Sequence, residues 1–197
     1  MSLTTLGLEL PTDPRWVNIA EMNIGEILID HAFCEQKAAS SCISLIVQYP
    51  EKEKLVEVLT PVVAEEWGHF QRVLKELRKR NIPLSHKRRD EYVHALQQHI
   101  RKSGNHLEQL MEKLLLNALI EARSCERFKL LSEYIADEGL RKFYRELMIS
   151  EAGHYRTFIE LAEEYCGKER ARTRWKELLD TEAQIMATLA VRGDRMH

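Results

Sequence analysis

The 197-residue chain is short of the residues that interrupt regular structure and of those that form disulfide frameworks. It contains only 8 glycines and 5 prolines, so few positions break a helix or impose a turn. Its 4 cysteines form no C-x-x-C pair, which argues against a zinc ribbon or a rubredoxin-like iron site. We interpret them as reduced, mostly buried thiols: Cys34, Cys42, Cys125 and Cys166.

The chain also lacks a long apolar run and a large net charge. The longest uncharged stretch near an apolar segment covers the 13 residues 38–50, well short of the roughly 20 that a membrane-spanning helix needs. The N-terminal segment has no basic stretch followed by an apolar run, which argues against a secretory signal. A formal charge of −2 does not mark the whole molecule as a binder of nucleic acid or membranes. We therefore expect a cytoplasmic protein without a membrane partner.

Long helices are expected between the few breaks. With 44% hydrophobic and 30% charged residues, the chain can bury one core, which favours a single domain over residues 1–197. Apolar residues recur at steps of three and four, and no strand alternation competes with this period. A short helix is expected around Trp16. The predicted core helices cover about residues 24–49, 51–80, 105–136 and 138–166, and an extra C-terminal helix covers about 169–191.

The lengths of the connections predict the topology. The first and second core helices are joined by a short turn, as are the third and fourth, so each pair should form an antiparallel hairpin. The second and third are separated by roughly 25 residues, enough to cross the length of a bundle. We expect an all-α, four-helix bundle with a long crossover between the second and third helices and additional terminal helices.

Acidic residues interrupt the apolar face of all four core helices. In two helices a histidine follows the acid by three positions. The two side chains therefore lie on the same face of the helix and can converge on one point in the core. Converging buried carboxylates would repel one another strongly unless cations lay among them. The pattern therefore predicts a metal site with the ligands Glu35, Glu66, His69, Glu121, Glu151 and His154.

The spacing of these six residues reveals an internal repeat. Glu35 and Glu66 are 31 residues apart, and Glu121 and Glu151 are 30 apart. Each copy offers one carboxylate from its first helix and a Glu-x-x-His pair from its second, which is the ligand set of di-iron and di-manganese carboxylate bundles. Imidazole and carboxylate suit both iron and manganese, so the ligand types leave the two metals open.

Other polar and aromatic residues near these faces are interpreted as structural. Helical position rotates three acids away from the ligand face: Glu26, Glu65 and Glu126. His31 lies one turn before Glu35 and could support the site, but a packed or hydrogen-bonded histidine is the favoured interpretation. The following side chains are interpreted as packing residues: Cys34, Cys125, Trp67, Phe70, Tyr155 and Phe158.

The segments around these residues resemble a known family. The pattern Glu35, Glu66-x-x-His69, Glu121, Glu151-x-x-His154 resembles the ferritin-like di-iron superfamily. The stretches "DHAFCEQKAAS", "EEWGHF", "IEARSCERF" and "SEAGHYRTF" are similar to the bacterial tRNA 2-methylthio-N(6)-isopentenyladenosine hydroxylases. This resemblance implies a non-haem di-iron monooxygenase that uses O₂ to hydroxylate the isopentenyl group of a modified adenosine next to the anticodon of tRNA.

The same resemblance implies cofactors and partners. Two iron ions would be the cofactors, with manganese less suited, and O₂ would be the co-substrate. Two external electrons would be needed, and the chain carries no flavin, nicotinamide or iron-sulfur motif. A separate electron-donor protein or reductase is therefore implied as a partner. No oligomeric state follows from the residues.

A basic cluster would suit the tRNA anticodon stem-loop as a partner. The segment 72–89 contains eight Lys and Arg residues and only one acid, Glu76, although the total charge of the chain is −2. Such a local excess of positive charge would allow phosphate contacts on one side of the protein. An unpaired loop nucleotide would reach an interior site more readily than a base in a duplex. The alternative is a solvated helix end, where Lys and Arg are common. The candidate tRNA contacts are Arg72, Lys75, Arg78, Lys79, Arg80, Lys87, Arg88 and Arg89, with a weaker group of Lys168, Arg170, Arg172, Arg174 and Lys176.

Other functions are compatible with these residues. A ferritin-like protein for iron oxidation and storage would use the same ligands, and so would a di-manganese or di-iron peroxidase or a manganese catalase. A structural helical bundle without metal is the remaining alternative.

Overall fold

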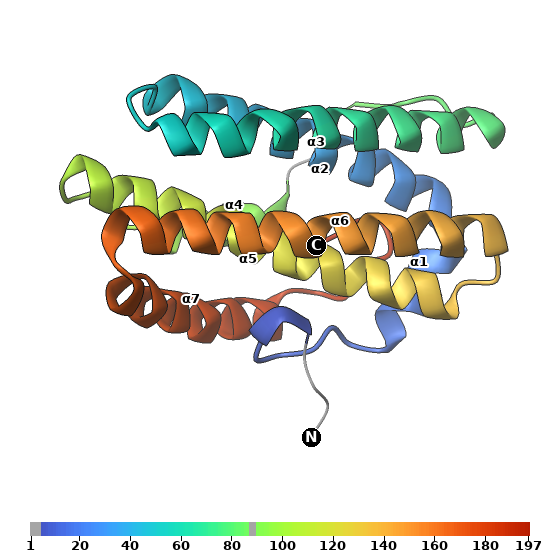
Figure 1. Ribbon diagram of the computed structural model, residues 1–197. Helices are drawn as coiled ribbons and strands as arrows, with labels where there is room; N and C mark the ends of the chain where they lie inside the picture. The colour runs from blue at the N-terminus through green and yellow to red at the C-terminus, as the bar shows by residue number, and fades with distance from the viewer. Residues whose placement is uncertain (1–4, 87–89) are drawn as a thin grey trace. The chain divides into compact units, whose positions relative to one another are not determined.

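The computed structural model describes residues 5–86 and 90–197, and the regular secondary structure of these residues consists of helices (Figure 1). A 3₁₀ turn, η1 (Thr5–Gly7), precedes α-helices whose bounds lie close to the predicted ranges. No helix in the described ranges is both long and apolar enough to span a membrane. The helices are α1 (Arg15–Met22), α2 (Ile24–Gln48), α3 (Glu53–Lys79), α4 (Glu91–His99), α5 (His106–Tyr134), α6 (Glu138–Cys166) and α7 (Lys168–Thr188).

Contacts within the chain define two compact units, each built on one of the predicted hairpins. The α2–α3 unit comprises Ile19–Arg89 and Arg192–Met196. The α5–α6 unit comprises Met1–Asn18, Asp90–Val191 and His197. The single domain expected over residues 1–197 stays a prediction.

The α2–α3 unit is a helical hairpin that buries one face of each helix. On α3 the buried positions, which include Glu66 and His69, recur at steps of three and four, as the sequence period predicts. Close packing at the end of the hairpin involves Gly25, where an added Cβ would lie 3.0 Å from Cδ1 of Ile82. The hairpin thereby holds α2 and α3 at a fixed register, which positions the polar residues on their buried faces.

In the α5–α6 unit, local signals define where the helices begin and end. Asn105 and Glu108 form a capping box at the start of α5, and Asp137 accepts a hydrogen bond from the amide of Leu140 at the start of α6. Gly167, with a φ of 85°, ends α6 in a conformation that favours glycine. The adjacent α7 packs on α4, α5 and α6, and it is the predicted extra C-terminal helix.

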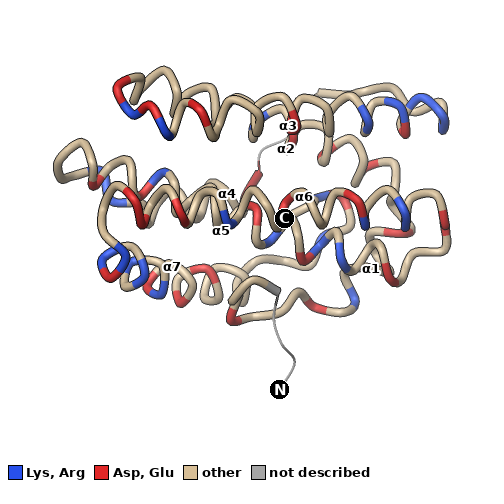
Figure 2. Tube along the Cα trace, viewed as in Figure 1, with Lys and Arg blue, Asp and Glu red and all other residues tan. Residues whose placement is uncertain are grey.

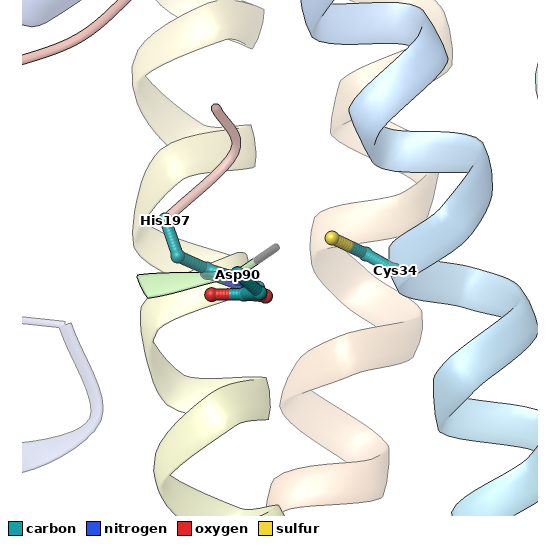
Figure 3. A group of neighbouring side chains, drawn as sticks. All are labelled: Cys34, Asp90 and His197. Atoms are coloured by element: carbon teal, nitrogen blue, oxygen red, sulfur yellow. The ribbon is translucent and has the colours of Figure 1, made fainter. Parts of the chain in front are cut away.

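The short α4 lies in the long connection before α5 and is anchored by polar contacts at its start. Asp90 accepts a hydrogen bond from the amide of Val93, 3.0 Å away. Figure 3 shows His197 beside Asp90, and His197 Nδ1 lies 3.4 Å from Asp90 Oδ2. The other ring nitrogen, Nε2, lies 2.9 Å from Ser124 Oγ on α5. The His197 side chain therefore links the start of α4 to α5 within this unit.

A buried ionic network, which the sequence analysis did not predict, also stabilises the α5–α6 unit. Arg123 on α5 is fully buried and donates to Glu182 Oε1 on α7 at 2.9 and 2.6 Å and to the carbonyl of Leu10 at 3.0 Å. Glu126 accepts from Arg123 and, at 2.6 Å, from the Thr12 hydroxyl. Burial lowers the pKa of Arg123, but the charges of Glu182, Tyr92 and Glu126 and the hydrogen bond to Glu182 together outweigh burial and raise it. The network therefore joins residues 10–12 and α7 to α5.

Candidate metal centre

The α2–α3 unit brings together three predicted ligands, Glu35, Glu66 and His69, which we call the first triad. All three are buried, Glu35 on α2 and the other two on α3. His69 Nδ1 lies 3.4 Å from Glu35 Oε2 and 3.7 Å from Glu66 Oε2. Glu65, in contrast, is exposed. The prediction that helical position selects Glu66 rather than Glu65 is therefore confirmed.

His31 supports the first triad from the preceding turn of α2. Its ring is fully buried, and its Nε2 lies 2.5 Å from Glu35 Oε1. The hydrogen-bond partner of His31 is thus one of the predicted ligands, so the structure agrees with the less favoured interpretation, in which His31 supports the site. Because one oxygen of Glu35 is held by His31, the other is directed toward His69.

The α5–α6 unit brings together the second triad, Glu121, Glu151 and His154. All three are buried, and one ligand atom of each lies within 4.8 Å of the others. His154 Nδ1 lies 3.1 Å from Glu151 Oε2. Glu126, predicted to be rotated off this face, is engaged with Arg123 and Thr12 instead.

Cys125, one turn after Glu121, is a buried core residue. Burial, followed by the negative charges of Glu151 and Glu121, raises the pKa of Cys125 to about 12. The thiol donates to the carbonyl of Met148 at 3.4 Å. The interpretation of Cys125 as a small packing residue is therefore confirmed.

The chemistry of each triad fits a first-row transition metal ion. Two carboxylates and one imidazole are buried together, and adjacent donor atoms 3.1 to 3.7 Å apart are spaced much as ligands about 2.1 Å from one ion would be. Adjacent buried carboxylates are strongly unfavourable without a neutralising cation. Oxygen and imidazole donors suit iron and manganese. The buried carboxylates and imidazoles are therefore compatible with a metal site, and the assignment of these six residues as its ligands stays a prediction.

The basic cluster on α3 is only partly available to a ligand. Figure 2 shows cations at the C-terminal end of this helix, where Lys75, Arg78 and Lys79 are exposed. Lys79 and Arg80 contact Glu76 at 2.6 and 2.7 Å. Burial of Glu76 would raise its pKa, but the hydrogen bonds from both cations outweigh burial and lower it. The candidate contacts Lys87, Arg88 and Arg89 lie outside the described residues.

The weaker basic group on α7 is largely structural. Arg174 is buried and donates to both carboxylate oxygens of Glu112 at 2.7 and 2.8 Å. Arg170 pairs with Glu108, and Arg172 pairs with Glu163. These ion pairs hold α7 to α5 and α6, which leaves the group poorly suited to bind phosphate.

The aromatic residues beside the triads differ in their environment. Phe158 is buried, as predicted, and Tyr155 packs against Trp175 with ring centroids 5.7 Å apart. Trp67 contacts Phe70 at 4.9 Å, but 45% of its surface is exposed. Trp67 is therefore only partly packed, and the prediction that it is a packing residue does not hold for its exposed part.

Comparison with known proteins identifies relatives along most of the chain. A family model described as tRNA-(MS[2]IO[6]A)-hydroxylase (MiaE) matches residues 3–197. The tRNA 2-(methylsulfanyl)-N(6)-isopentenyladenosine(37) hydroxylase of Pseudomonas putida is 37% identical, over 87% of this chain and 82% of its own. The Salmonella typhimurium protein of the same name is 28% identical, over 85% of this chain and 80% of its own.

A solved structure shows the same fold. It is titled a protein with aldehyde deformylating oxygenase activity from Synechococcus, and it matches with a TM-score of 0.90 and 34% identity. The match covers 96% of this chain and 94% of the other. The all-α, ferritin-like fold class and the resemblance stated from the sequence are both confirmed. The chain belongs to the tRNA-(MS[2]IO[6]A)-hydroxylase (MiaE) family.

Proposed function

We propose that this protein is a non-haem di-iron monooxygenase that hydroxylates the isopentenyl group of a modified adenosine next to the anticodon of tRNA. The observation that carries the proposal is the pair of buried triads of identical composition, one in each hairpin of a chain that matches the hydroxylase family along its length. Storage and peroxidase functions would use similar ligands, but family membership favours the hydroxylase. An enzyme that acts on tRNA would work in the cytoplasm.

The proposed cofactor is a pair of iron ions, for which the two triads would provide the ligands. Together the triads provide four carboxylates and two imidazoles, so two ferrous ions would balance the four negative charges. The bound ions would supply the reduction of O₂ and the oxidation of an unactivated C–H bond. Manganese would also fit these donors, and iron is proposed because of the hydroxylation chemistry.

The chain's own contribution is to orient the ligands and exclude water. His31 holds Glu35, which restricts the rotation of that carboxylate. Buried apolar residues flank the ligands one turn away, namely Ala32, Ala39, Val62, Val73, Ala118, Leu147 and Phe158. Such surroundings strengthen the electrostatic interactions within the site and keep bulk water from the reacting groups.

The reaction also requires a reductant. When one atom of O₂ enters the substrate and the other becomes water, two electrons and two protons must be supplied from outside. Because the sequence contains no flavin, nicotinamide or iron-sulfur motif, we propose a separate electron-donor protein or reductase as the partner. The exposed cations of α3 are the proposed contacts for tRNA phosphates.

Nucleoside analysis of cellular tRNA would test this function. A strain lacking the protein should lose the hydroxylated isopentenyladenosine, and expression of the wild type or of Glu65→Ala should restore it. Glu66→Ala and His154→Ala should fail to restore it at equal protein levels, because each removes a buried ligand. An unchanged nucleoside profile in the deletion strain would refute the proposed function.

A further inference from the structure

Trp67 is exposed in a way that the metal site does not explain. Of the 3 tryptophans, Trp16 and Trp175 are 1% and 6% exposed, whereas Trp67 is 45% exposed. It lies on α3 directly after the ligand Glu66, with its ring against Phe70 at an interplanar angle of 39°. An exposed indole increases the contact of apolar surface with water, so a binding role would account for its position.

Trp67 begins a continuous stripe along the outer face of α3. Trp67, Gln71, Lys75 and Arg78 follow one another at steps of four, four and three residues, so they share one side of the helix. All four are exposed. We call these four residues the α3 stripe. Within the described part of the chain, Lys75 and Arg78 form no ion pair, unlike Lys79 and Arg80.

The internal repeat provides a comparison that separates binding from architecture. The residues of α6 that lie 85 positions after the α3 stripe are Ala152, Arg156, Glu160 and Glu163. The second hairpin thus has alanine in place of the tryptophan and acids in place of both unpaired cations. The last turn of α3 contains Arg78 and Lys79, whereas the last turn of α6 contains no basic residue. Because α6 carries the same Glu-x-x-His pair without the indole or the two cations, these three side chains are not needed to present the predicted ligands.

We propose that the α3 stripe binds unpaired nucleotides of the tRNA loop, with Trp67 stacking on a nucleobase and Lys75 and Arg78 contacting phosphates. This inference rests on the proposed function. It adds Trp67, which is not part of the basic cluster, as a residue that contacts a base of the bound RNA. Every base has a flat face that can stack on an indole, and aromatic residues among cations are typical of single-strand binding sites. At 1.5 Å per residue, Trp67 and Arg78 are about 16 Å apart along the helix, a span that a few nucleotides can cover.

The charge of the stripe favours RNA over a second protein chain. The cores of protein interfaces are depleted of lysine, whereas here Gln71, Lys75 and Arg78 continue the surface that Trp67 begins. Phosphates complement the two unpaired cations, and a base complements the indole. A homodimer contact through Trp67 is the competing outcome of the test.

Tryptophan fluorescence of the iron-loaded protein would test the inference directly. A synthetic anticodon stem-loop RNA should quench the emission of the wild type, since the exposed indole stacks on a base while Trp16 and Trp175 are buried. A fully paired RNA of equal length should quench it much less. Trp67→Phe should lose most of the quenching and retain affinity within about threefold, because phenylalanine still stacks.

Affinity measurements provide a second readout. Trp67→Ala should weaken stem-loop binding about tenfold or more, with an unchanged slope of log affinity against log salt. Lys75→Gln and Arg78→Gln should each reduce the slope by about one. Ile149→Ala is the matched control, since it removes an apolar residue that is 65% exposed on α6, and it should leave affinity unchanged. Equal iron content in all variants would show that the ligand Glu66 is undisturbed.

Two outcomes would overturn the inference. One is stem-loop binding by Trp67→Ala with wild-type affinity together with unquenched emission in the wild type. The other is sedimentation in which Trp67→Ala dissociates a dimer while its RNA affinity is unchanged. Failure of the proposed function would differ from both, because then the wild type would hydroxylate no tRNA in the nucleoside assay.

Discussion

At the scale of single residues, the site depends on the orientation of buried carboxylates. His31 lies 2.5 Å from one oxygen of Glu35, and His69 Nδ1 lies 3.4 Å from the other. The two oxygens of one carboxylate thereby have different partners. A side chain that is not itself a predicted ligand therefore determines the direction in which a ligand points.

His31→Ala is expected to weaken metal binding while leaving all six predicted ligands in the chain. Loss of the hydrogen bond to Glu35 should reduce the affinity for Fe²⁺ or Mn²⁺ by about 10- to 100-fold, the usual effect of removing a partner of a metal ligand. Isothermal titration calorimetry under anaerobic conditions would measure the affinity for each metal ion. Glu65→Ala, an exposed control on α3, should retain wild-type affinity. Equal affinities in His31→Ala and wild type would show that Glu35 needs no such support.

At the scale of helices, the sequence period predicted the structure closely because each long helix has one buried apolar face. The predicted range 138–166 coincides with α6, and 24–49 exceeds α2 by one residue. The triads were also predictable, because each hairpin repeats an acid followed about 30 residues later by Glu-x-x-His. These signals are local or periodic, so they can be detected in one chain.

The contacts that could not be predicted connect distant positions without a period. Arg123 and Glu182 are 59 residues apart, and Thr12 and Glu126 are 114 apart. The helical position of Glu126 places it off the ligand face, but nothing in the sequence identifies its partner. Exposure of Trp67 was likewise missed, since an aromatic beside a ligand is compatible with both a packed and an exposed position.

Gly153 should limit the stability of α6. Glycine within a helix costs about 1 kcal/mol relative to alanine, and an added Cβ at Gly153 would meet no atom within 4 Å. Gly153→Ala should therefore stabilise the metal-free protein by about 0.5–1 kcal/mol in thermal or denaturant unfolding. Gly167→Ala is the opposing control, because Gly167 has a φ of +85° and should lose stability. Destabilisation by Gly153→Ala would indicate that this position is constrained by something other than helix propensity.

Arg123 should be essential to the packing of α7 on α5. Arg123→Met would leave Glu182 and Glu126 buried without their cation, so a loss of about 3–5 kcal/mol in the free energy of unfolding is expected. Urea unfolding would measure this loss. Arg15→Met, which breaks an exposed pair with Asp13, should change the same quantity by less than about 1 kcal/mol.

A double variant would separate lost charge pairing from lost volume. Adding Glu182→Gln to Arg123→Met should recover part of the stability, because it removes one of the uncompensated buried charges. The effect of Glu182→Gln on the free energy of unfolding should therefore differ between the wild type and Arg123→Met. If Glu182→Gln lowers stability equally in both, the two residues are not coupled.

At the scale of the whole molecule, the two hairpins bury the same types of predicted ligand residue. They differ in the residues on the outer faces of α3 and α6. Each unit buries two glutamates and one histidine at equivalent positions. The outer face of α3 carries an indole and unpaired cations, while the equivalent positions of α6 carry alanine, arginine and acids. Equivalent ligand sets are what the proposed metal binding requires of both hairpins, and a difference between their outer faces is what binding of one asymmetric substrate requires. The two surfaces therefore fit an enzyme that binds tRNA on one side.

The central claim is that the two triads together support O₂-dependent hydroxylation of tRNA. The most direct measurement is mass spectrometry of nucleosides from isopentenylated tRNA that has been incubated with the iron-loaded protein, a chemical or enzymatic reductant and ¹⁸O₂. The account predicts one ¹⁸O atom in the hydroxylated isopentenyl group with the wild type and with Glu65→Ala, and none with Glu66→Ala or Glu151→Ala. Hydroxylation that persists in both ligand variants, or oxygen derived from water in the wild-type product, would contradict it.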